Sequence, residues 1–158
     1  MPQHDDIRGQ LREDHDSYLA ELEALRAEAD EHRCKSRLRA LRHAWAIHAL
    51  AEESVVYRAV EAADPIPVPA VDANARFIEH ELIEGLFERL EHGRLGTLEW
   101  RARLRVACEL IGRHIEHEQE DLFVRLERQL DAGALRLMAE EFERERQRLA
   151  RLEVPKAA

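Results

Sequence analysis

Six histidine and glutamate side chains occur in two copies along the chain, in a pattern that could bind metal ions. Each copy has one histidine, followed 33 or 34 residues later by a His-x-x-x-Glu pair, and the copies are offset by 65 or 66 residues. The six residues are His15, His48, Glu52, His80, His114 and Glu118. Imidazoles and carboxylates without thiolates suit first-row metals, iron best, with manganese or zinc as alternatives. The pattern therefore predicts a site for two adjacent metal ions.

The helical register turns these side chains toward the protein interior. Residues four apart on an α-helix differ by about 40° in direction, so each His-x-x-x-Glu pair shares one face. His48 and Glu52 continue an apolar stripe through Trp45, and His114 and Glu118 are flanked by isoleucine and leucine. Buried charges without partners would cost several kcal/mol each, a cost that a bound cation removes. A structural hydrogen-bonded pair would explain either pair alone, but the repetition in register favours a metal site.

Capping and helix-breaking residues divide the chain into the five helices that must position this site. Asp, Ser and Thr side chains are the expected N-caps, and prolines 65, 67 and 69 end the second helix. The first break is expected around Cys34–Ser36. The expected helices run from Asp5 or Asp6 to about His32, from Ser36 to just before Asp64, from Asp72 to about His92, from Thr97 to about Asp131, and from Ala134 to about Leu152.

Four long helices with short links predict an all-α fold, an up-down-up-down four-helix bundle. Residues 1–132 would form the bundle, and residues 133–158 would add an amphipathic C-terminal helix and a short tail to the same domain. We expect this last helix to pack on the outside of the bundle or to mediate association, which makes a homo-oligomer through it a candidate.

Length and composition narrow the class of protein. With 158 residues, of which 45% are hydrophobic and 36% charged, the chain is expected to form one helical domain. A net charge of −9 argues against non-specific binding to nucleic acid or to an anionic membrane. No apolar run approaches the roughly 20 residues that span a bilayer, and the polar N-terminus is unlike a signal peptide. The two cysteines have no framework spacing, so we expect a cytoplasmic protein with free thiols.

The two copies resemble the signature of the hemerythrin-like (HHE cation-binding) family over residues 5–130. That signature has a histidine in the first and third helices and His-x-x-x-Glu in the second and fourth. The flanking segments Glu52–Tyr57 and Leu122–Phe123 are also similar. The resemblance implies a hemerythrin-like bundle and a non-haem di-iron centre, in which the two glutamates bridge the ions and the imidazoles are terminal ligands.

One position departs from the oxygen-carrying members of that family. They place a second histidine one turn after the histidine of the third helix, where this sequence has Glu84, four residues after His80. Either Glu84 is a metal ligand, or it holds an imidazole through the outer ring nitrogen. As a ligand it would surround the His80 and His114 metal with more anionic oxygen, which favours the ferric state. Reversible oxygen carriage is therefore not expected.

The sequence favours a metal centre that reacts with or senses a small ligand, namely dioxygen, peroxide or nitric oxide. A second interpretation is a metal-responsive binding or regulatory module without turnover, in which the last helix contacts a partner. A third is a structural bundle that binds adventitious zinc. The sequence has no nucleotide-binding motif and no general base away from the metals, so it does not decide between an enzyme and a binding protein.

Overall fold

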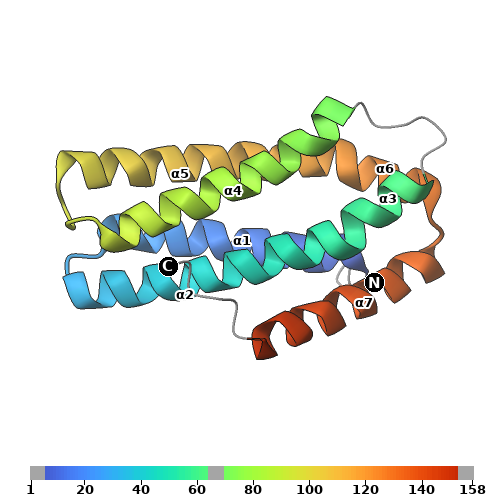
Figure 1. The fold of residues 1–158 in the computed structure, drawn as a ribbon, viewed down its shortest axis with the longest axis horizontal. Helices are drawn as coiled ribbons and strands as arrows, with labels where there is room; N and C mark the ends of the chain where they lie inside the picture. Colours follow the sequence, from blue (N-terminus) through green and yellow to red (C-terminus); the bar gives the residue numbers. More distant parts are fainter. Residues whose placement is uncertain (1–5, 64–69, 153–158) are drawn as a thin grey trace.

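Five long helical segments make up the protein, which a computed structural model describes over residues 6–63 and 70–152. Four of them run alternately up and down in a bundle, and the fifth lies against one side of it (Figure 1). The described residues contain no strand. None of the described helices has the length and hydropathy of a membrane-spanning helix. The structure confirms the predicted all-α four-helix bundle with an additional C-terminal helix.

Two of the bundle helices contain a short π-helical turn. The first and third bundle helices are α1 (Ile7–Ala27) and α4 (Ala70–His92). The second consists of α2 (Glu31–Ala51), η1 (Glu52–Tyr57) and α3 (Arg58–Ala63). The fourth consists of α5 (Leu98–His117), η2 (Glu118–Leu122) and α6 (Phe123–Gln129), and it is followed by α7 (Ala132–Arg151). Both π-helical turns begin at a glutamate of the predicted metal site.

Side-chain oxygens cap the bundle helices where the sequence places two of the caps. Asp6 accepts hydrogen bonds from the backbone N–H groups of Arg8 and Gly9 at the start of α1. Thr97 accepts one from Trp100 at the start of α5. Each cap satisfies an N–H group that has no partner within the helix. Both predicted helix starts are confirmed.

The first break lies earlier than the sequence predicts. α1 ends at Ala27, and Asp30 rather than Ser36 caps the next helix, accepting from the N–H of Arg33 at 2.8 Å. Cys34, which falls in the predicted break, is buried in α2. Aspartate and serine cap helices about equally well, so residue type alone does not choose between them. Both cysteines are free thiols, as expected.

Two later boundaries also differ from the prediction. α4 begins at Ala70 rather than at Asp72. Asp131 begins α7, accepting from the N–H of Ala134 at 2.8 Å, rather than ending the helix before it. In this position the Asp131 carboxylate pairs with an N-terminal N–H group of the helix that follows, an interaction that the helix dipole also favours. The predicted end of the second helix at Asp64 lies outside the described residues.

The apolar core consists of two clusters, and the histidines and glutamates lie between them. Along α1, Leu11 belongs to one cluster and Tyr18 to the other, with His15 between them. The fourth bundle helix runs in the opposite direction, from Ile111 in the cluster of Tyr18 to Leu122 in the cluster of Leu11. Apolar side chains on both sides exclude water from the polar layer, which strengthens electrostatic interactions within it.

α7 packs against the bundle, which was one of the two roles predicted for it. It contacts α1, α2 and η1 (Figure 1). Its buried residues recur at helical spacing and include Leu135, Met138 and Phe142. Phe142 is fully buried and belongs to the same cluster as Leu11. The helix is therefore part of the core that encloses the polar layer.

Candidate metal centre

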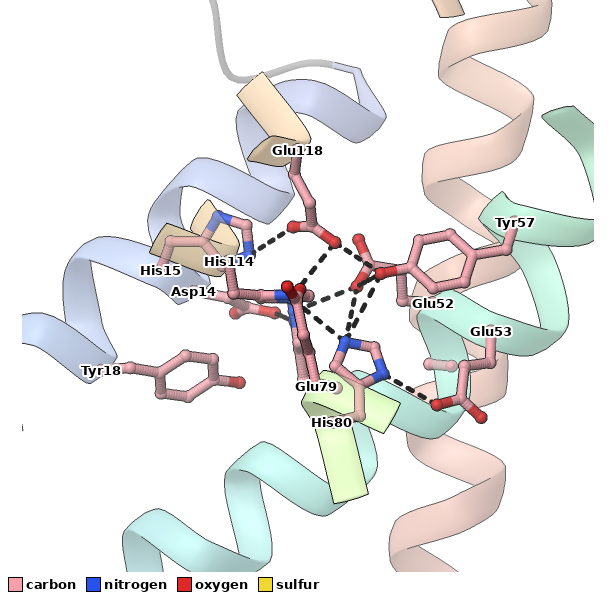
Figure 2. A network of polar contacts seen from close by, with 12 residues as sticks. Asp14, His15, Tyr18, Glu52, Glu53, Tyr57, Glu79, His80, His114 and Glu118 are labelled. Atoms are coloured by element: carbon pink, nitrogen blue, oxygen red, sulfur yellow. Dashed lines mark hydrogen bonds and ion pairs between the residues drawn. The ribbon is translucent and has the colours of Figure 1, made fainter. Parts of the chain in front are cut away.

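The six residues of the repeated motif meet in one buried layer. All of them are buried: His15, His48, Glu52, His80, His114 and Glu118. α1 and α4 each supply one histidine, α2 and α5 each supply another, and η1 and η2 each supply a glutamate as their first residue. Figure 2 shows side chains from these elements converging on one place. The structure thus brings together every residue that the repeat singled out.

Glu118 contacts histidines from both copies of the motif. Its Oε2 lies 3.2 Å from Nε2 of His15, which belongs to the first copy. Its Oε1 lies 3.2 Å from Nε2 of His114, which belongs to the second. One carboxylate therefore spans the two halves of the layer.

Glu52 has the same position with respect to the remaining two histidines. Its Oε2 lies 3.7 Å from Nε2 of His48 and 3.5 Å from Nε2 of His80. Ligand atoms of Glu52, His80, His114 and Glu118 all lie within 4.8 Å of one another, a spacing compatible with binding one metal ion. Each carboxylate is thus placed between an imidazole of the first copy and an imidazole of the second, where it could be shared by two ions.

Carboxylates hold the outer nitrogens of three of the four imidazoles. The Nδ1 contacts are His48–Asp14 at 2.9 Å, His80–Glu53 at 2.7 Å and His114–Glu79 at 2.9 Å. A carboxylate that accepts the Nδ1 proton fixes the ring and leaves Nε2 directed inward as a ligand atom. Asp14 and Glu79 each directly precede a histidine of the motif, so these two contacts repeat with the offsets of the motif, 65 residues for the carboxylates and 66 for the histidines.

Four ligand atoms in the layer make no hydrogen bond among the described residues, although two of them, His15 Nε2 and Glu118 Oε2, lie 3.2 Å apart as an ion pair. They are His15 Nε2, His48 Nε2, Glu52 Oε1 and Glu118 Oε2. Buried polar atoms without a partner are costly, and folded proteins rarely gather several in one place. All four are imidazole nitrogens or carboxylate oxygens, which are the donors that first-row metal ions accept. The residues present therefore fit a metal centre.

Tyr57 is a further polar residue in this layer that the motif did not identify. Its hydroxyl donates to Glu118 Oε1 at 2.6 Å and lies 3.2 Å from Glu52 Oε2. The hydroxyl also lies 3.5 Å from Nε2 of His80, and the two rings stack with centroids 5.8 Å apart (Figure 2). The phenol oxygen is as close to the ligand atoms as those atoms are to one another.

The π-helical turn explains why α-helical spacing misses Tyr57. In an α-helix, residue i+5 lies about 140° around the axis from residue i, which would turn Tyr57 away from Glu52. Hydrogen bonds of a π-helix run from i to i+5, and this wider turn brings residue i+5 back over residue i. Five residues after Glu118 the chain has Phe123, so only the first copy supplies a hydroxyl. The sequence signal that could have identified Tyr57 is that the first copy of the repeat has a tyrosine where the second copy has a phenylalanine.

Glu84 is the predicted site residue that the structure places away from the others. Its Oε1 accepts from Nε of Arg42 at 2.6 Å, and Arg42 also contacts two further glutamates of α4. The outer nitrogen of His80 is held by Glu53 instead. Neither expected role of Glu84, metal ligand or partner of an imidazole, corresponds to its contact in the structure. The additional oxygen near His80 comes from Tyr57.

The buried groups shift one another's pKa values. Burial lowers the pKa of His114, but contacts with Glu118 and Glu79 outweigh burial and raise it to about 10. Burial raises the pKa of Glu118, but His114 and His15 hold it well below its usual range. Burial, together with the nearby carboxylates, raises the pKa of Tyr57. A metal ion binding here would replace the protons that imidazole and carboxylate share.

A cavity of about 410 Å³ lies on the His114 side of the centre. Its lining includes Arg76, Glu79, His114, His117, Glu118 and Asp121. Arg76 pairs with Asp121 at its edge, and the Arg76 guanidinium lies 5.4 Å from the centre of the Tyr57 ring. A larger cavity of about 880 Å³ is lined by residues near the α1–α2 and α4–α5 links and includes none of the six ligand residues. The smaller cavity therefore offers a small molecule a route to the centre.

Comparison with protein families agrees with this geometry. Residues 6–126 match the family described as Hemerythrin HHE cation binding domain. The matched segment covers most of the chain and contains all six buried histidines and glutamates of the motif. No match was found among curated proteins or among solved structures. The chain belongs to the hemerythrin HHE cation-binding domain family.

Proposed function

We propose that this protein is a non-haem di-iron protein that binds or reacts with a small ligand. The observation that supports the proposal is the position of the two buried carboxylates, each of which contacts imidazoles from both copies of the motif. Six ligand residues on four helices are more than one ion needs, and two ions sharing both carboxylates would use all of them. Nitrogen and oxygen donors without thiolate favour iron, with manganese or zinc as alternatives.

The ligands would divide according to the repeat. The two histidines of the first copy would hold one ion and those of the second copy the other, with Glu52 and Glu118 shared. Tyr57, whose hydroxyl is 3.5 Å from His80, would add an oxygen on the second side. The two metal positions would then differ, and the second would carry more oxygen ligands.

The surrounding residues would orient the ligands and control access to them. When bound, two ferrous ions supply electrons and an open coordination position for dioxygen, peroxide or nitric oxide. The outer carboxylates Asp14, Glu53 and Glu79 keep the imidazole Nε2 atoms directed inward. The two apolar clusters exclude bulk water, and the cavity beside His114 admits a small molecule.

The test is exposure of the iron-loaded protein to each small ligand. After anaerobic loading with ferrous iron, we expect the absorption spectrum to change on addition of dioxygen, hydrogen peroxide or nitric oxide. The double variant Glu52→Ala/Glu118→Ala should show no change. His43→Ala is the control, because His43 is an exposed histidine of α2 that lines neither the centre nor the cavity.

The same experiment separates this proposal from a metal-responsive module without turnover. That module would load iron through the same residues but would show no spectral response to any of the three ligands. Such a result would contradict the proposed reactivity and favour the regulatory interpretation.

A further inference from the structure

α7 contacts the metal centre through Phe142 and Arg146, and both act on His48. The buried Phe142 ring meets the His48 ring edge-on, with centroids 6.0 Å apart. Arg146 Nη1 lies 3.1 Å from both carboxylate oxygens of Asp14. Oδ2 of Asp14 is in turn 2.9 Å from Nδ1 of His48. α7 is therefore joined to one ligand residue by a packed ring and by a chain of two polar contacts.

The half of the centre that contains His114 has equivalent ligands, whereas α7 packs against the half that contains His48. Glu79 holds His114 as Asp14 holds His48, each at 2.9 Å. The second oxygen of Glu79 lies 3.7 Å from His117, a residue of the same helix as His114, and Glu79 lines the cavity. The His48 and His114 sides thus match in their outer carboxylates, whereas α7 packs over the His48 side and the cavity opens on the His114 side.

The contacts of α7 are suited to fixing the His48 ring. The Asp14 side chain is 14% exposed and that of Arg146 33%, so their ion pair is partly shielded from solvent. Outer carboxylates of metal-binding imidazoles typically change metal affinity by roughly 10–100-fold when they are lost. A guanidinium in contact with both oxygens restricts the carboxylate that in turn orients the imidazole.

We propose that α7 holds the first-copy metal position in place, with Arg146 and Phe142 as positioning residues for His48. This inference rests on the proposed di-iron function. Because docked α7 keeps His48 in its ligand orientation, docking strengthens metal binding on that side. Linkage is reciprocal, so a bound metal strengthens the docking of α7 by the same factor. Occupancy of a buried metal position is thereby transmitted to a helix at the surface of the molecule.

Metal retention by the whole chain tests whether the docking of α7 strengthens metal binding. Arg146→Met removes the guanidinium and keeps a long apolar side chain, and Phe142→Leu removes the ring contact. After anaerobic loading with ferrous iron, a chelator should extract one iron of each variant roughly 10-fold faster than from the wild type, and the other at an unchanged rate. Arg146→Lys should restore part of the slow extraction, because an ammonium group still pairs with Asp14.

Amide hydrogen exchange of α7 tests the reciprocal effect, that bound metal strengthens the docking of α7. In the wild type, exchange within residues 132–151 should slow when iron is loaded, whereas in Arg146→Met it should change little. Arg148→Met is the matched control, because Arg148 is exposed and its partner Glu145 lies on α7 itself. Glu79→Gln should speed extraction of the other iron and leave the slowing of α7 exchange intact.

Two outcomes would overturn the inference alone. One is equal extraction from Arg146→Met and Arg148→Met, and the other is α7 exchange in the wild type that does not depend on iron. Either result, with two irons bound, leaves the di-iron proposal standing. A wild-type chain that binds no iron would overturn both proposals.

Discussion

At the scale of single residues, the centre depends on carboxylates that orient the histidine rings of the site. Asp14, Glu53 and Glu79 each accept an imidazole Nδ1–H, which keeps Nε2 directed at the two buried glutamates (Figure 2). Such contacts also make the imidazole a stronger ligand. Tyr57 then adds a hydroxyl among the ligand atoms, so the phenol and the outer carboxylates together distinguish the two halves of the site.

Replacing Tyr57 by phenylalanine should remove a visible absorption band of the ferric protein without loss of iron. Burial and Glu118 raise the pKa of the Tyr57 phenol, but an adjacent cation reverses this effect and stabilises the phenolate. A phenolate bound to ferric iron absorbs visible light. Tyr18→Phe is the control, because the Tyr18 hydroxyl donates to the backbone oxygen of Ala44 at 3.3 Å. Identical spectra for the wild type and Tyr57→Phe would exclude the phenol as a ligand.

Metal binding is expected to release protons from His114. Its pKa is raised from 6.5 to about 10, against the effect of burial, by Glu118 and Glu79, so the metal-free protein holds the proton between these values. Protonation stabilises the metal-free fold below pH 6.5, and this contribution is lost as the pH rises through about 10. Metal affinity should rise over the same range, because a metal ion requires unprotonated Nε2.

Calorimetric titration with Zn²⁺ measures this release. The apparent enthalpy should depend on the ionisation enthalpy of the buffer at a pH between 6.5 and 10. The dependence should be smaller for His114→Gln. A buffer-independent enthalpy for the wild type would show that no proton is displaced.

At the scale of elements, α-helical spacing predicts the six motif residues of the site. It does not predict the position of Tyr57, because the chain there forms a π-helical turn. The six motif residues are predictable because the four histidines lie in regular α-helix and each glutamate is the first residue of a π-helical turn. Tyr57 is the last residue of the first of these turns, so α-helical geometry assigns it to the wrong face. Glu84 lies on the same face of α4 as His80. Its contact with Arg42, however, depends on how α2 and α4 pack together, and residue spacing within one helix does not predict that packing.

The helix boundaries are also predictable only in part from the sequence. Asp6 and Thr97 are the polar residues that immediately precede their helices, and both caps were predictable. Asp131 stands between two helices, where residue type leaves open whether it ends one or begins the next. The structure assigns it to α7, through its contact with the N–H of Ala134.

Asp131→Ala should therefore destabilise α7 and leave the bundle helices intact. Loss of an N-cap costs about 1 kcal/mol, whereas asparagine retains a capping oxygen. We expect faster amide exchange in the first turn of α7 for Asp131→Ala and near-wild-type exchange for Asp131→Asn. Equal exchange in all three proteins would show that Asp131 does not cap this helix.

At the scale of the whole molecule, two repeated halves enclose a polar layer that two apolar clusters separate from solvent. The repeat makes the ligands of the halves equivalent, and α7 and the cavity make their surroundings different. The unpartnered ligand atoms in this layer lower the stability of the metal-free fold. Stability and metal binding are therefore linked through the same side chains.

Metal loading should raise the melting temperature for this reason. A metal at 100 times its dissociation constant adds about 2.7 kcal/mol, which for a chain of this size corresponds to a rise of roughly 5–10 °C. Differential scanning calorimetry with and without Zn²⁺ measures the shift. Glu52→Ala/Glu118→Ala should show none, and an equal shift in that variant would mean that the metal binds elsewhere.

The most direct test of a two-metal centre is the iron content of the chain after anaerobic ferrous loading and desalting. We predict two irons per chain for the wild type and close to none for Glu52→Ala/Glu118→Ala, since both carboxylates contact imidazoles of both halves. A wild-type content of one iron or none, or two irons retained by the double variant, would contradict the account.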